Sequence, residues 1–129
     1  MSANVRITQE PDHRRRLDLA FVRGLAAEEG LYFGIMNDVF CLETFEGEDV
    51  HDVWLVLFSQ RIYCRGVQMK IDAQDDLEFI LNLPAGPADI ACFYRLISRC
   101  CLTLGVVSFV QEEEVCALEE IDRLREELI

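Results

Sequence analysis

The chain has 129 residues and a mass of 14.8 kDa, which suits one domain over residues 1–129 and is too small for two. Its 51% hydrophobic content excludes an intrinsically disordered chain and slightly exceeds ordinary apolar usage. Twelve Lys and Arg against 24 Asp and Glu give a formal charge of −12, which opposes binding to nucleic acid. The chain is therefore expected to be one acidic domain, either whole or as a fragment or subunit of a larger assembly.

Residues 1–16 lack the apolar core of a secretory signal, and no segment approaches the ~20 apolar residues that cross a bilayer. This predicts a cytoplasmic protein that does not bind membranes. In that compartment the six cysteines are expected to be reduced thiols. They are Cys41, Cys64, Cys92, Cys100, Cys101 and Cys116.

The first elements are a short strand around Val5 and Ile7 and a segment over residues 12–29 with two interpretations. Apolar residues spaced by four, with Asp12 as a cap and Gly30 as a stop, favour a helix. An alternation of apolar residues from Leu17 onward favours a strand instead. We predict a helix here. Its basic run, Arg14 to Arg16, is expected to be a solvated flank and not an anion site.

The middle of the chain reads as a hairpin followed by a meander. Two β-rich runs over residues 31–45 are joined by Asn37 and Asp38, which tolerate the positive φ of a tight turn. Further strands are predicted over 53–58, 61–71 and 77–83. The alternation of apolar and polar residues at 67–71 predicts that one face of that strand is exposed to solvent. Short connections between them predict antiparallel pairing.

Residues 77–110 predict a strand, a long helix and a second strand. Gly86 and Pro87 suit the start of that helix, Asp89 suits its first turn, and Gly105 suits a left-handed stop. The predicted class is α+β: a largely antiparallel sheet, with a long central helix packed on one face and an amphipathic helix at the carboxyl end.

The terminal residues 112–129 predict that amphipathic helix, with Glu119 placed to meet Arg123 one turn later. Such a stripe docks on the sheet, packs on another copy of the chain, or is the cut end of a longer protein. We expect a protein partner or a homo-oligomer to use it. Its apolar residues are Val115, Leu118, Ile121, Leu124 and Leu128.

A thiol nucleophile needs a nearby base to lower its pKa, and His13 and His51 are the two histidines. The candidate catalytic group is therefore Cys41 or Cys64 with His51. The acidic loop around His51 lacks the spacing of a calcium or zinc site, and no phosphate or dinucleotide loop is present, so no metal or cofactor is expected.

The segment 81–109 contains a Leu-Pro turn, Asp-Ile, Phe-Tyr-x-x-Ile and Leu-Gly-Val. It resembles a stretch of an uncharacterised bacterial family known only as a domain of unknown function. The resemblance covers about a quarter of the chain and implies a bacterial cytosolic protein, with no activity or site to carry over.

Three functions follow as alternatives. The first is a non-enzymatic interaction or regulatory module, which the apolar excess and the terminal helix favour. The second is a small enzyme that uses Cys41 or Cys64 with His51. The third is an acidic decoy of a nucleic-acid-binding protein, which only the −12 charge supports. We favour the first.

Overall fold

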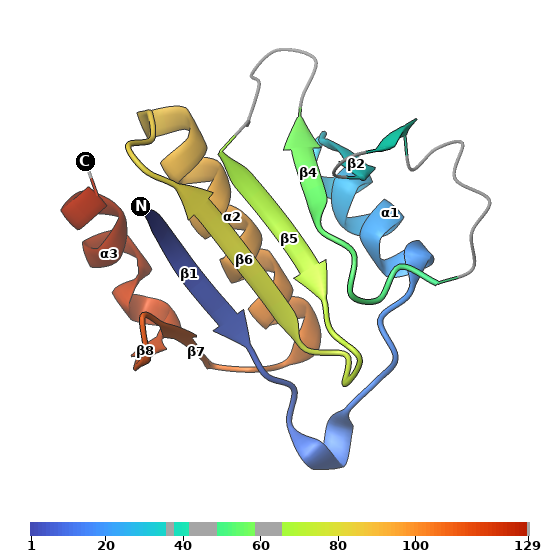
Figure 1. The fold of residues 1–129 in the computed structure, drawn as a ribbon. Coiled ribbons are helices and arrows are strands. Elements are labelled where there is room, and N and C mark those ends of the chain that lie inside the picture. The colour runs from blue at the N-terminus through green and yellow to red at the C-terminus, as the bar shows by residue number, and fades with distance from the viewer. Residues whose placement is uncertain (36–37, 42–48, 59–65, 129) are drawn as a thin grey trace.

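The computed structural model describes residues 1–35, 38–41, 49–58 and 66–128, with the backbone alone for 35, 38–41, 57 and 58. In this part of the chain the fold is a mixed α+β arrangement with an antiparallel sheet and helices, as predicted (Figure 1). The strands are β1 Ser2–Ile7, β2 Tyr32–Ile35, β3 Asp38–Cys41, β4 Leu55–Phe58, β5 Val67–Ile71, β6 Leu77–Asn82, β7 Ser108–Gln111 and β8 Glu114–Ala117. The α-helices are α1 Leu19–Glu29, α2 Pro87–Leu104 and α3 Ile121–Leu128.

The described strands form one sheet in the order β3-β2-β4-β5-β6-β1-β7-β8, in which every paired neighbour runs antiparallel. Alternation decides which side chains enter the core, because successive residues of a strand point to opposite faces. In β5, Val67, Met69 and Ile71 are fully buried, whereas Gln68 and Lys70 are only partly covered. The prediction that the strand at 67–71 has one buried face and one more exposed face is confirmed.

Helix α2 passes across one face of the sheet behind β5 and β6 in Figure 1. It begins after Gly86 and ends at Gly105, whose φ of 70° is the left-handed stop that the sequence predicts. Its buried stripe includes Ile90, Phe93 and Ile97. The prediction for this element is confirmed from end to end.

Helix α1 confirms the helical interpretation of residues 12–29 but begins later, at Leu19. Asp18, and not Asp12, caps it by accepting a hydrogen bond from the Phe21 N–H at 3.1 Å. The residues before it are held by bonds to distant residues: Leu17 donates its N–H to Asp75 Oδ1 at 2.9 Å. That long-range bond is invisible to a local pattern, and it explains the late start.

The prediction of a helix over 112–129 is wrong for its first third. Glu112 and Glu113 adopt φ values of 49° and 69° and form a tight turn, after which β8 pairs with β7. Leu118–Glu120 form a single 3₁₀ turn, and α3 follows. The predicted pair of Glu119 with Arg123 is also wrong, since Arg123 bonds Glu120 at 2.9 Å and Glu127 at 2.7 Å.

Strands β2 and β3 confirm the hairpin with a shifted turn. Ile35 pairs with Asp38, so the two connecting residues are 36 and 37, which lie outside the described residues. The predicted strand over 53–58 is present as β4, and the predicted strand over 61–71 is described from Val67 onward.

The terminal stripe packs within its own chain. Leu124 is 7% exposed and belongs to the core, and Leu118, Ile121 and Leu128 pack against that core, whereas Val115 is 75% exposed. Helix α3 contacts α2, beside the sheet edge formed by β7 and β8. None of the described helices is long and apolar enough to cross a bilayer.

Candidate functional site

The turn between β5 and β6 is the most connected polar feature of the described chain. Asp72 closes the turn by accepting hydrogen bonds at Oδ1 from the N–H groups of Gln74 at 2.9 Å and Asp76 at 3.0 Å. Burial alone would raise the pKa of Asp72, but these backbone bonds and the Arg6 guanidinium outweigh burial and lower it. Asp72 is therefore a buried, ionised anchor.

Three further side chains fasten the amino-terminal segment to this turn. Gln9 is 2% exposed and donates its side-chain N–H to Asp75 O at 2.7 Å, while its backbone N–H reaches Asp76 Oδ1 at 3.0 Å. Arg14 donates to the same Asp76 oxygen at 2.8 Å. Arg6 bonds Asp72 as well. Arg14 is exposed, as predicted for a solvated flank, and it also forms an ion pair with a carboxylate on a turn distant in the sequence.

His51 lies between two carboxylates at this end of the sheet. Its Nε2 is 2.6 Å from Asp75 Oδ1, and its Nδ1 contacts Asp49 Oδ1. The hydrogen bond that the His51 ring donates to Asp75 raises the pKa of His51 despite partial burial. The His51 side chain is 13% exposed, although Asp49 and Asp52 on either side of it in the loop are exposed.

The predicted pairing of Cys41 or Cys64 with His51 lies outside what the structure describes. Only the backbone of Cys41, in β3, is described, and Cys64 is outside the described residues. Both nitrogens of His51 are already engaged by carboxylates. The thiol-enzyme hypothesis therefore stays a prediction.

The other four cysteines are buried, as expected for Cys92 and Cys101. Burial raises the pKa of Cys101 to about 12 and raises those of Cys100 and Cys116 as well. A thiol with a raised pKa carries almost no thiolate near neutral pH. These cysteines are therefore part of the packing.

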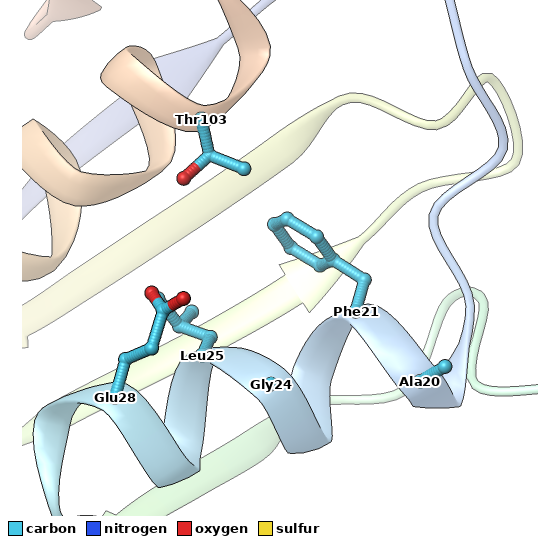
Figure 2. A pocket seen from close by; sticks show the side chains of 6 residues that line it. All are labelled: Ala20, Phe21, Gly24, Leu25, Glu28 and Thr103. Atoms are coloured by element: carbon cyan, nitrogen blue, oxygen red, sulfur yellow. The ribbon is translucent and has the colours of Figure 1, made fainter.

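A hollow of about 160 Å³ lies between α1 and α2. Figure 2 shows Phe21, Leu25 and Glu28 of α1 pointing toward Thr103 of α2. Small-molecule pockets are usually larger, at roughly 300–1,000 Å³. The described residues also contain no cluster of three or more His, Cys, Asp or Glu side chains placed to hold a metal ion.

The face of the sheet opposite α2 carries a continuous row of side chains, one from each of six neighbouring strands or their ends. Strand pairing places Lys70 beside Glu78, Glu78 beside Arg6, Arg6 beside Val110 and Val110 beside Val115. The Lys70 ammonium lies 4.9 Å from the centre of the Trp54 ring, which starts the row. We call this set the open-face row: Trp54, Lys70, Glu78, Arg6, Val110 and Val115.

The charged side chains of the open-face row form ion pairs and remain partly exposed to solvent. Arg6 bonds Glu78 at 2.7 Å, and Lys70 lies 3.6 Å from the other Glu78 oxygen. The Arg6 side chain is 41% exposed. Since the helices cover the other face, these groups are available to a partner.

The fold and this geometry define the chain as an α+β protein with helices over one face of an antiparallel sheet. No family model, curated protein or solved structure matches the chain. The resemblance of residues 81–109 to an uncharacterised bacterial family therefore stays a prediction.

Sequence reasoning missed both the Asp72 anchor and the open-face row. A signal for the first was present, because Asp72-Ala73-Gln74-Asp75-Asp76 has the composition of an Asx turn. No local signal could reveal the row, since its members come from strands paired out of chain order.

Proposed function

We propose that this chain is a non-enzymatic protein-interaction module that binds a second copy of itself through the open-face row. The supporting observation is the composition of that row, which combines a tryptophan, an arginine, the exposed Val115 and the partly buried Val110 on a face without a helix. Aromatic residues and Arg are the types enriched in protein interfaces.

The order of the row supports a symmetric pair. If two rows align in opposite directions about a two-fold axis, Glu78 of one copy faces Arg6 of the other, and Trp54 faces Val115. The row carries two cations and one anion, whereas the whole chain carries −12. Two copies would therefore repel each other less across this row than the net charge of the whole chain suggests.

The mass of the full chain in solution, measured by size exclusion with light scattering, tests this proposal. We expect a dimer for the natural chain and a monomer for Val115→Glu, because the new carboxylate would be desolvated beside Trp54 of the other copy. The matched control is Leu102→Glu, at another exposed apolar residue, on α2 and away from the open face. That variant should stay dimeric.

A monomeric natural chain at high protein concentration would overturn the proposed self-association. A Leu102→Glu monomer with a Val115→Glu dimer would place the interface on the helical side instead.

A further inference from the structure

Both ring nitrogens of His51 face carboxylate oxygens, and this geometry constrains the protonation of the ring. A neutral imidazole has one donor and one acceptor nitrogen, whereas an imidazolium has two donors. The facing oxygens of Asp49 and Asp75 already act as acceptors, from the N–H groups of His51 and Leu17 respectively. Only an imidazolium satisfies both contacts at once.

This cluster joins segments that are distant in the sequence. Asp49 and His51 lie in the loop before β4, and Asp75 lies in the turn between β5 and β6. The same two segments are joined by a backbone bond from Asp52 N–H to Ile71 O at 2.7 Å. The side chains of His51 and Asp75 thus reinforce the isolated β-bridge between His51 and Ile71.

We propose that protonation of His51 controls the attachment of the loop over residues 49–52. The imidazolium holds this loop on the β5–β6 turn, and loss of its proton releases the loop. Of the described residues, Asp49, Asp75 and the nearby Arg16 are the charged groups that act on the cluster. Arg16 acts on both carboxylates and would compete with the imidazolium for them. This inference is independent of the proposed self-association.

The direction of the pH dependence follows from the bond with Asp75. That bond raises the pKa of His51 above its ordinary value of 6.5, so the folded state holds the proton more tightly than the unfolded state. The stabilisation is complete below pH 6.5 and is lost as the pH rises through the raised pKa. The loop should therefore open as the pH rises through that raised pKa.

Nitrogen NMR of the histidine rings in the full chain tests the protonation. We expect both His51 nitrogens to be protonated at pH 6.5, with a titration midpoint above that value. Asp75→Asn should lower the midpoint; Asn tolerates the positive φ of 65° at this position and can still accept the Leu17 N–H. The control Asp122→Asn, at an exposed carboxylate on α3, should leave the midpoint unchanged.

Amide hydrogen exchange tests the release of the loop. After correction for the intrinsic pH dependence of exchange, protection of the Asp52 N–H should fall as His51 loses its proton. Protection of the Val106 N–H, bonded to Cys101 O at the end of α2, should not change.

A neutral His51 tautomer at pH 6.5, or a midpoint that Asp75→Asn leaves in place, would overturn the proposal. Parallel loss of protection at Asp52 and Val106 would also do so, because it would indicate global unfolding. His51→Gln should abolish the pH dependence at Asp52, and if that variant does not fold, the titration of the natural chain still decides.

Discussion

Among the described residues, Glu112 and Glu113 adopt positive φ values that suit glutamate poorly. Both have positive φ, 49° and 69°, in the two-residue turn between β7 and β8. Turns of this kind favour Asn and Gly, since a side chain in the left-handed region costs roughly 1 kcal/mol. Glu112 has a compensating bond, because its carboxylate accepts the Asn4 N–H at 2.7 Å.

We predict that Glu113→Gly raises the free energy of unfolding by about 1 kcal/mol, because glycine removes that backbone strain. Urea unfolding of the two chains measures the change. Glu113→Ala is the matched control, since it removes the same charge and keeps a Cβ at positive φ. Equal stabilisation by both variants would assign the effect to charge and not to backbone strain.

At the level of elements, the predicted apolar stripe of α3 is present, but it packs against the core of its own chain. The stripe over 115–128 was predicted as a surface for a partner, yet Leu124 lies in the chain's own core and α3 packs against α2. Only Val115 points freely outward, because it belongs to β8 and not to a helix.

We therefore predict that Leu124→Ala lowers the free energy of unfolding by about 2–4 kcal/mol, as a buried leucine should. Val115→Ala, which also shortens an apolar side chain at the carboxyl end, should cost less than about 1 kcal/mol. Chemical denaturation at a concentration that keeps both chains monomeric compares them. Similar costs at the two positions would contradict the observed packing of α3.

For the whole molecule, acid stability depends on the polar cluster at the β5–β6 turn. Hydrogen bonds and neighbouring cations lower the pKa values of Asp72 and Asp75 below the ordinary 3.8, against the opposing effect of burial. A group whose pKa is lowered on folding stabilises the fold above its ordinary pKa. That contribution is lost as the pH falls through the lowered value.

We predict that the free energy of unfolding falls as the pH drops below 3.8, because protons enter these carboxylates more readily in the unfolded chain. Urea titrations at a series of pH values measure the slope. Asp72→Asn should flatten it, while Asp122→Asn, at an exposed residue of α3, should not. An unchanged slope in Asp72→Asn would show that Asp72 is not the anchor.

Most of the fold could be predicted from local patterns. The two-residue alternation at 67–71 and the glycines that bound α2 each specify their element through short-range sterics and burial. The same rules failed at Glu112 and Glu113, where pairing with β7 overrides a helical pattern. They failed again at Leu17, which lies outside the helix and donates its N–H to Asp75 instead.

By itself the sequence determined the α+β class, the antiparallel meander, the central helix and the burial of Cys92 and Cys101, because these depend on periodicity and capping within a few residues. Only the tertiary structure decided that Asp72 anchors the amino-terminal segment, that His51 sits between two carboxylates, and that six strands align their side chains in the open-face row. Each of these features joins residues far apart in the chain. Their proximity depends on which strands pair and in what register, and that is a property of the whole core rather than of any local segment.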